Sequence, residues 1–496
     1  MRAVGIARSV SLVALTAILF SPGLWLGAPL DAAVFVLAGV RIRDGYVPYK
    51  DLWDHKPPGA YLLNAMGQTV LPWLDPWLVS WLLTVVFTGA AILIVDRLLR
   101  LRLAPIVSFV GSLLCLAGMA LYPVALGGGA TESFAVLPLV AALWLIASSL
   151  PTWRRSALIG CLLGLACLLS MQALAAAVVL FAVTVAGGGT VGAARRACAA
   201  IVGGAALPLA VIGWLAARGA LGDAIDQIVT YNSAYRASAD YSLEMVVVTL
   251  LLFAGLAVPV AVTVTRMARR PRAFDRVDWA CLAWSAAFAA YVVFQGRIYL
   301  HYWILLLPPI SWLAGSGMGW LVGQAKSSNR GLKARAIGLV TASAFAFSIS
   351  AMMASQLIST TTKRASDLKI PTDETAAWVK ASTPASATVF VWGDDPVLYL
   401  TSDRDPYDRY VYEFPLTTAG YWSPDRTAML LSVWAASPPP VIVESPSPVP
   451  MFRPPQAYPD PRADDTLAPL RDFVRGHYRL AATFGDHDVY LLVSSG

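Results

Sequence analysis

Ionisable side chains are concentrated in one short stretch, residues 31–59, of a chain that is otherwise mostly apolar. The stretch holds four aspartates, one histidine, two lysines and two arginines: Asp31, Asp44, Asp51, Asp54, His55, Lys50, Lys56, Arg41 and Arg43. Charges inside a bilayer cost several kcal/mol, so such a cluster has to lie at a membrane edge or in water. A carboxylate can take up a proton and cations can hold an anionic group, which makes this stretch the first candidate for a reactive site.

The composition predicts an integral membrane protein. Hydrophobic residues make up 57% of the chain and charged residues only 14%, against about 25% in soluble globular proteins. The mean hydropathy is +0.62. The apolar runs end near residue 358, and the remainder is polar and rich in proline. We therefore expect a membrane domain, residues 1–358, and a second domain, residues 359–496.

Eleven apolar runs predict eleven membrane-spanning helices, since a span needs about 20 residues. The first run could instead be a cleaved signal peptide, but it continues to residue 29 without a small-x-small cleavage site behind a short core. The runs are residues 10–29, 76–94, 104–123, 133–150, 157–170, 173–186, 198–217, 245–264, 279–295, 302–322 and 337–358.

The basic residues predict how these helices are oriented. With a cytoplasmic N-terminus, the inner loops hold eighteen Lys and Arg, whereas the outer loops before the second domain hold seven. Because basic residues favour the cytoplasmic side, we expect a multi-pass protein of the cell membrane whose first outer loop, residues 30–60, and C-terminal domain are extracytoplasmic. The net charge of +7 is then explained by the topology, and membrane lipids are the expected partners. It does not indicate nucleic-acid binding.

The C-terminal part has the pattern of a small α/β domain. Helices are predicted over residues 372–382, capped by Thr372 or Asp373, and over 466–477. Strands are predicted over residues 388–392, 441–444, 478–484 and 489–493. Asp394, Asp395 and His487 fit ordinary turns between these elements, so we expect no catalysis there, while a role in acceptor recognition stays open.

Several polar residues could have a structural role instead of a functional one. Asp31 follows the first apolar run and could cap a helix over residues 32–43 as readily as serve as a base. Glu132 could be a second acid or a helix cap, and Tyr231 could line an acceptor groove or belong to an aromatic belt. His55 beside Asp51 and Asp54 could bind a divalent cation, although one histidine with nearby carboxylates is a weak metal signal. The five cysteines lie in apolar runs and indicate neither disulfides nor a zinc site.

The first loop resembles the first outer loop of bacterial GT-C glycosyltransferases. The pattern is Asp31 followed by DGYVPYKDLWDHKPPGAYLL, residues 44–63. The resembling group includes the polyprenyl-phosphate-mannose protein mannosyltransferases and the lipid A aminoarabinose transferases. Three further places are similar: Thr131-Glu132 after three glycines, residues 297–302 leading into residues 305–309, and residues 389–400 with 409–412. The resemblance covers nearly the whole chain.

This resemblance implies an enzyme that transfers a hexosyl or pentosyl group, with inversion, from a polyprenyl-phosphate sugar to a glycan, lipid or protein acceptor. Asp31 matches the family's general base. Family members often have an acidic pair there, whereas Ala32 follows Asp31, so a second acid would be absent or supplied by Asp51 or Asp54. The lipid phosphate released from such a phosphodiester donor is a good leaving group, so the reaction needs a base and cations but no general acid.

Three residues can supply the cations at the donor phosphate: Lys56, Arg297 and His301. Arg297 is the one cation in its outer loop, although it could also reach lipid head groups. His301 could be an interfacial helix-end histidine instead, and Tyr302 beside it is a candidate for acceptor contact. We expect Asp31, Lys56 and Arg297 to converge on one outward cavity. No cofactor is certain.

Two other classes of function stay open at this stage. A transporter or lipid flippase would need a polar path near the middle of the membrane, whereas the acidic residues here gather at one face. A catalytically inactive scaffold would tolerate Asp31→Asn, which an enzyme would not.

Overall fold

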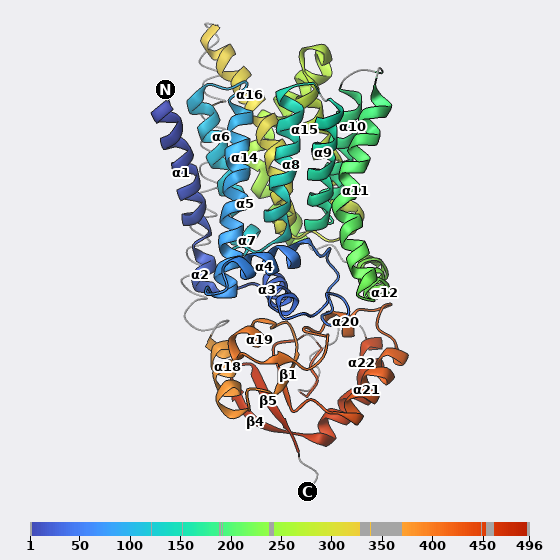
Figure 1. The fold of residues 1–496 in the computed structure, drawn as a ribbon. Coiled ribbons are helices and arrows are strands. Elements are labelled where there is room, and N and C mark those ends of the chain that lie inside the picture. Colours follow the sequence, from blue (N-terminus) through green and yellow to red (C-terminus); the bar gives the residue numbers. More distant parts are fainter. Residues whose placement is uncertain are drawn as a thin grey trace.

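The computed structural model describes residues 2–120, 122–150, 152–187, 190, 192–237, 243–327, 338, 370–447, 449–452 and 461–493. Within these residues, a bundle of long helices carries a smaller mixed domain at one end (Figure 1). The N-terminus lies at the opposite end of the bundle from that domain. Which end faces the cytoplasm, and where the first domain ends, stay predictions.

Each predicted span before residue 328 coincides with a helix, because long apolar runs satisfy their backbone groups internally in this way. The predicted span 337–358 lies outside the described residues apart from residue 338, and the count of eleven stays a prediction. Among the described residues, five helical segments are long and apolar enough to cross a membrane: Gly5–Leu26, Pro76–Leu99, Thr131–Ser148, Ala193–Ala217 and Arg276–Gln295. The bundle helices are α1 (Arg2–Phe20), α2 (Pro22–Leu26), α5 (Pro76–Leu99), α6 (Pro105–Ala120), α7 (Tyr122–Ala125), α8 (Thr131–Ser148), α9 (Trp153–Leu169), α10 (Ala173–Ala186), α11 (Ala193–Ala217), α14 (Leu243–Arg269), α15 (Arg276–Gln295) and α16 (Leu307–Ser327), with the short η2 (Pro271–Ala273) before α15.

Local sequence explains where several of these helices begin. Asp75 caps α5 by accepting a hydrogen bond from the Leu78 amide (3.0 Å), and Pro76 occupies the first turn, where no amide is needed. Asp275 and Asp278 form a capping box at the start of α15. Glycine then allows close packing: a Cβ on Gly160 of α9 would lie 2.0 Å from the Ala200 carbonyl oxygen of α11.

Ion pairs join the helices at the end that carries the N-terminus. Arg8 of α1 pairs with the buried Asp96 of α5, and Arg102 binds Asp278 at 2.8 Å. The pairing of both aspartates with arginines fits a role in holding the bundle together.

Short helices form a layer between the bundle and the C-terminal domain (Figure 1). Gly39 lets α3 and α4 approach closely, since a Cβ there would lie 2.8 Å from the Asn64 Cβ. The segment Asp226–Tyr231 is a π-helix, a local form often found at functional sites. The elements of this layer are α3 (Leu30–Arg43), α4 (Gly59–Val70), α12 (Leu221–Ile225), η1 (Asp226–Tyr231), α13 (Asn232–Ala237) and η3 (Leu300–Leu305).

The predicted α/β domain is confirmed as a five-stranded sheet with order β2-β1-β3-β5-β4. Strand β1 pairs in parallel with β2 and β3, while β5 pairs antiparallel with β3 and β4. The strands are β1 (Thr388–Trp392), β2 (Asp405–Pro406), β3 (Val441–Glu444), β4 (Tyr478–Phe484) and β5 (His487–Leu492); the helices are α18 (Ile370–Ser382), α19 (Val397–Ser402), α20 (Phe414–Thr417), α21 (Pro424–Ala436) and α22 (Pro461–His477).

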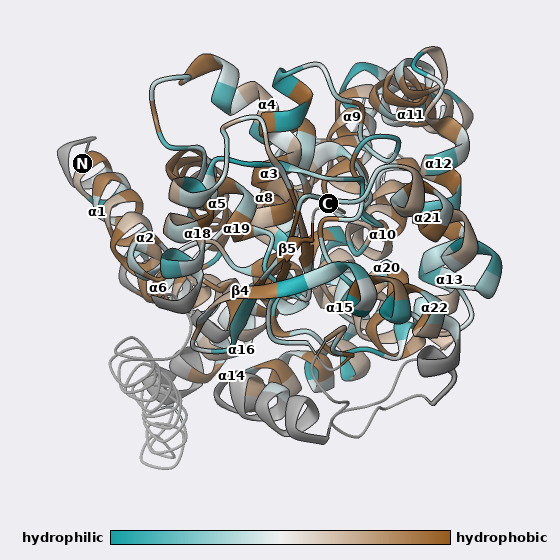
Figure 2. Cartoon of the chain, turned by 90° about the horizontal axis from the view of Figure 1, so that it is seen from below, coloured by the Kyte–Doolittle hydropathy of each residue, from teal (hydrophilic) through white to brown (hydrophobic). Residues whose placement is uncertain are grey.

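Alternate residues of β1 pack on opposite faces of the sheet, as its period of two requires. Phe390 and Trp392 join the core under α21 and α22, whereas Val389 and Val391 join the core that continues into the membrane domain. Seen from the side of the C-terminal domain, the sheet lies over the middle of the bundle (Figure 2). One correction concerns α18, which begins before Thr372; the Thr372 hydroxyl donates to Asp395 Oδ2 (2.7 Å), 23 residues away.

Candidate active site

The first outer loop is held in place by tyrosine hydroxyls. The Tyr49 hydroxyl donates to the Lys56 carbonyl oxygen at 2.8 Å, and the Tyr61 hydroxyl lies 2.9 Å from the same oxygen and 2.6 Å from Asp54 Oδ2. Tyr49 and Tyr61 are both fully buried, and Tyr49 has the positive φ of 70° that this tight loop requires. The main chain of Lys56 is therefore fixed independently of its side chain.

Asp31 and Lys56 form an ion pair at the start of α3. The helix begins at Leu30, and the Asp31 side chain makes no cap, so the capping alternative is wrong. Phe35 lies one turn further along α3, and its ring centroid is 5.0 Å from the Lys56 ammonium. The spacing of four residues places the carboxylate and the ring on one helix face, where both contact the same lysine.

Opposing effects set the ionisation of this pair. Burial favours the neutral form of Asp31, but the opposing interactions, of which the charge of Lys56 is the largest, hold the pKa of the carboxyl below its usual value. Burial likewise opposes charge on Lys56, yet Asp31 and Asp54 raise the pKa of the ammonium. Both groups are therefore charged at neutral pH. The Asp31 side chain is 41% exposed, against 15% for Lys56, so it is accessible to a second reactant.

Asp54 is buried and its carboxylate is surrounded by donors. The His55 amide donates to Oδ1 at 2.8 Å, the Tyr412 hydroxyl donates to Oδ1 at 2.8 Å, and the Tyr61 hydroxyl contacts Oδ2. Although burial would raise its pKa, the interactions with His55, Lys56 and Tyr61 lower it to about 2. Asp54 thus fastens the loop, and its buried carboxylate, which already accepts three hydrogen bonds, is not accessible to a substrate hydroxyl.

Asp51 and Tyr231 are engaged elsewhere. Asp51 Oδ2 accepts from the Val47 amide at 2.7 Å and closes a turn of the loop. Tyr231 is fully buried, with its ring edge-on to Trp53 at 4.6 Å and its hydroxyl 3.1 Å from that of Thr418. It therefore supports the contact between the two domains and does not line a groove.

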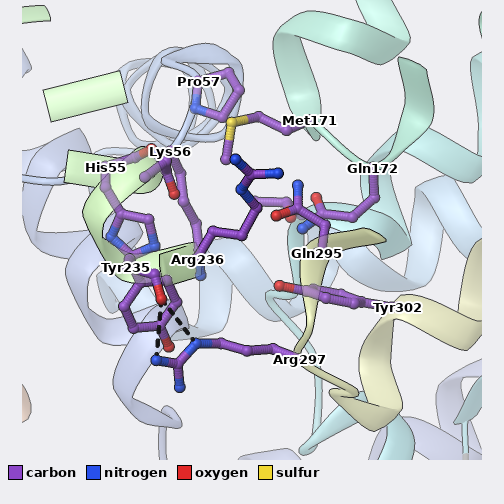
Figure 3. Close-up of a pocket in the computed structure, with 12 residues that line it drawn as sticks. His55, Lys56, Pro57, Met171, Gln172, Tyr235, Arg236, Gln295, Arg297 and Tyr302 are labelled. Carbon is purple, nitrogen blue, oxygen red and sulfur yellow. Dashed lines mark hydrogen bonds between the residues drawn. The ribbon is translucent and has the colours of Figure 1, made fainter. Parts of the chain in front are cut away.

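Lys56 and Arg297 line the same pocket, as expected (Figure 3). Arg297 donates to the Tyr235 carbonyl oxygen at 3.1 Å, and its guanidinium lies 3.8 Å from the centroid of that tyrosine's ring. Asp31 does not itself line this pocket but adjoins it through Lys56. His55, Tyr302, Gln172, Gln295 and Arg236 also contribute to the lining.

The pocket is small as it stands. The room between its side chains is about 30 Å³, enough for one or two water molecules. Arg236 of α13 extends into it between Lys56 and Gln295 (Figure 3). A phosphate group would need this long side chain to move aside, after which the guanidinium could contact it.

His301 and Glu132 lie behind the ion pair. His301 stacks on Tyr299 (5.6 Å) and lies edge-on to Tyr302 (4.8 Å). Burial lowers the pKa of His301 although Glu132 and Asp31 oppose that effect, so the ring is neutral at pH 7 and can donate one hydrogen bond but adds no charge. Glu132 is buried in the first turn of α8, accepts from the Ser170 hydroxyl (3.1 Å), and its Oε2 has no hydrogen-bond partner among the described residues.

No metal site was found in the part of the chain that the structure describes, where no group of three or more His, Cys, Asp or Glu could hold an ion. The oxygens of Asp54, which would be needed for the predicted site with Asp51 and His55, already accept hydrogen bonds. In their present positions, Asp51, Asp54 and His55 do not fit a divalent cation.

Sequence reasoning missed the residues that place the loop. Gln227 accepts from the Asp54 amide (3.1 Å) and donates to the Tyr49 carbonyl oxygen (2.7 Å), and the Asn232 amide group donates to the His55 carbonyl oxygen (2.8 Å). Tyr412 and Arg236 were missed as well. These residues lie more than 170 positions from the loop, and no local pattern links them to it.

No family model and no curated protein matches the sequence. Among solved structures, ArnT from Cupriavidus metallidurans bound to undecaprenyl phosphate matches 98% of this chain over 98% of its own length, with 15% identity and a TM-score of 0.63. The apo form of that protein gives 13% identity and a TM-score of 0.62, covering 100% of this chain and 99% of its own.

The oligosaccharyltransferase AglB from Archaeoglobus fulgidus, in complex with an inhibitory peptide and a dolichol-phosphate, matches 88% of this chain over 69% of its own length, with 13% identity and a TM-score of 0.53. ArnT and AglB are both GT-C glycosyltransferases. The resemblance found in the first loop is thus confirmed at the level of the fold: this chain has the GT-C fold of ArnT and AglB.

Proposed function

We propose that the chain is a membrane glycosyltransferase that moves a sugar from a polyprenyl-phosphate donor to an envelope acceptor outside the cytoplasm, with inversion at the anomeric carbon. The observation that carries this proposal is the ion pair of Asp31 and Lys56 beside a pocket lined by Arg297 and Arg236. The fold is shared with two proteins whose structures contain undecaprenyl phosphate or dolichol-phosphate, which supports a lipid-phosphate donor.

In this mechanism Asp31 is the general base. It takes the proton of an acceptor hydroxyl while the hydroxyl oxygen attacks the anomeric carbon, and the bond from that carbon to the phosphate oxygen breaks on the opposite face. The electron pair leaves with the polyprenyl phosphate. The proton on Asp31 then passes to solvent, so the products are the glycosylated acceptor, the lipid phosphate and one proton.

Lys56 links the two halves of this reaction. In the ion pair it keeps Asp31 ionised but weakly basic. As the leaving phosphate gains charge, the ammonium is drawn toward it. The carboxylate then loses its cation and becomes a stronger base at the moment when the acceptor proton must be removed.

The remaining predicted residues have supporting roles in this proposal. Arg297 and Lys56 hold the donor phosphate, and the neutral ring of His301 donates one hydrogen bond to it. Asp54 and His55 position the loop, and Glu132 adds negative potential behind Lys56. A divalent cation has no assigned place.

Transfer assays on the reconstituted protein test the proposal. Vesicles containing the full chain are incubated with a panel of radiolabelled polyprenyl-phosphate sugars, and release and transfer of the label are measured. Asp31→Asn should reduce transfer by at least about 10³-fold, a loss in the range seen when a catalytic base is removed. Asp44→Asn, in the same loop with its side chain 47% exposed, is the matched control. Equal transfer by Asp31→Asn would reject the base, and lipid movement without bond cleavage would indicate a flippase.

A further inference from the structure

A second and much larger cavity lies between the membrane domain and the C-terminal domain. Its volume is about 750 Å³, within the range of about 300–1,000 Å³ typical of small-molecule sites. One wall comes from residues 24 and 26–30 and from the start of α5, including Leu24, Leu26 and Trp77. The other comes from the loops after β1 and β3, from α18 and α19, and from the turn into β5.

The two walls differ in character. Leu24 and Leu26 end the apolar segment Gly5–Leu26, which is long enough to cross a membrane. This side of the cavity therefore lies where hydrocarbon gives way to lipid head groups. The opposite wall, from the C-terminal domain, is polar.

The polar wall is acidic, and the described lining contains no lysine or arginine. His487 is buried between two carboxylates, with Nε2 3.0 Å from Asp395 Oδ2 and Nδ1 2.9 Å from Asp486 Oδ1. Asp394 has a buried Oδ1 without a hydrogen-bond partner among the described residues. Its pKa is raised to about 7 by burial and by the charges of Asp31 and Asp395, so it can donate as well as accept a hydrogen bond.

The cavity adjoins the proposed base. Leu30 lines it, and Asp31 is the next residue. The charge of Asp31 also acts on Asp394 across the cavity wall. Asp31 thus lies between two spaces: the cation-lined pocket reached through Lys56, and this acidic cavity.

We propose that the acidic cavity binds the acceptor, and that the acceptor is a membrane glycolipid with an uncharged, polyhydroxylated head group. This inference rests on the proposed function. Sugar hydroxyls can donate to the carboxylates of the polar wall, while the lipid part lies against Leu24, Leu26 and Trp77. A phosphorylated head group would face several carboxylates in a described lining that holds no lysine or arginine, an arrangement that like-charge repulsion opposes.

Acceptor competition in vesicles tests this specificity. The full chain receives its labelled donor together with one of three probes: a dialkyl disaccharide glycolipid, the same glycolipid carrying one phosphate on its head group, or the free disaccharide. We expect kcat/KM for the neutral glycolipid to exceed that for the phosphorylated one by at least about tenfold, a modest free-energy difference for one repelled charge.

Charge reversal supplies the decisive comparison. Asp486→Lys changes a residue in a turn whose side chain is 47% exposed, and Thr401→Lys adds a cation to the same lining; either variant should reduce or reverse the preference. Asp472→Lys, exposed on α22 and outside the cavity, should leave it unchanged. Thermal unfolding verifies that each variant is folded, and the second lysine variant serves if the first is not.

The possible outcomes separate the two proposals. If no donor in the panel releases its sugar, the proposed function itself fails. If sugar is released but the wild type shows no preference for the neutral glycolipid, or both folded lysine variants keep the wild-type preference, the acceptor assignment is overturned. Transfer to the free disaccharide as efficient as transfer to the glycolipid, or hydrolysis without transfer to any probe, would also overturn it.

Discussion

Replacing Lys56 by glutamine should separate its two proposed roles, because one depends on pH and the other does not. The side chain is 15% exposed and its main chain is held by Tyr49 and Tyr61, so the substitution should leave the loop in place. Loss of a charged hydrogen bond to the donor phosphate costs about 1.5–3 kcal/mol, which lowers kcat/KM by roughly 10- to 150-fold.

The pH dependence follows from the sign of the shift on Asp31. In the wild type, Lys56 holds the pKa of Asp31 below 3.8, so the carboxylate persists into acid. Without Lys56 the effect of burial is no longer outweighed by that cation, and the pKa of Asp31 rises. The acidic limb of kcat/KM, which reports the free enzyme, should therefore move to higher pH, and the loss of activity should be largest in acid.

The assay is donor-dependent sugar transfer measured between pH 4 and 9, with Lys50→Gln as the matched control. Lys50 lies in the same loop but is exposed, so its replacement should change neither the rate nor the pH profile. A loss of the same size at every pH would refute the coupling of Lys56 to Asp31. Full activity at every pH would refute its contact with the phosphate.

Three further predictions concern residues around this pair. Arg297→Ala should raise the KM for the donor by about tenfold. Arg297→Lys should restore only part of the affinity for the donor, because the stack on Tyr235 is lost. An unchanged KM in both variants would remove Arg297 from the donor site. Asp54→Asn should lower the free energy of unfolding by about 2 kcal/mol at pH 7. The pKa of Asp54 is depressed from 3.8 to about 2, so the difference from the wild type should disappear as the pH falls through that range. Thermal or denaturant unfolding measures it. Asp96→Asn should destabilise the protein by about 3 kcal/mol by removing the buried carboxylate that pairs with Arg8 and Arg100, with kcat unchanged in the fraction that stays folded. A selective loss of kcat would contradict a purely structural role.

The fold was largely predictable because its main signals are local. Long apolar runs determine helices through backbone hydrogen bonding alone, and short apolar runs bounded by turn residues indicate the buried strands β1 and β3. The pairing of Asp31 with Lys56 could be predicted for the same reason. Asp31 directly follows an apolar run, and Pro57-Pro58, directly after Lys56, return the loop to the bundle 26 residues later.

The rest of the site depends on contacts between distant segments. Tyr412 donates to Asp54 across 358 positions, and Gln227 reaches the loop from a π-helix that no periodicity predicts. Arg236 looked like an isolated outer cation, yet α13 places it in the pocket. The acidic cavity was missed for a related reason, since Asp394, Asp395 and His487 each resemble turn residues until the two domains are brought together.

These distant contacts also explain why a reactive pair at the membrane surface would need a C-terminal domain. The domain holds the first loop through the Trp53 amide, which donates to the Arg409 carbonyl oxygen (2.7 Å), and through the hydroxyl of Tyr412 on Asp54. Asp54 and Lys56 are two residues apart, so the position of the ammonium depends on how the domain is seated. The acidic cavity is formed by the same seating. An acceptor bound between the two domains would therefore act on the loop that carries Lys56. Occupation of the cavity is in this way coupled to the placement of the Lys56 ammonium beside Asp31.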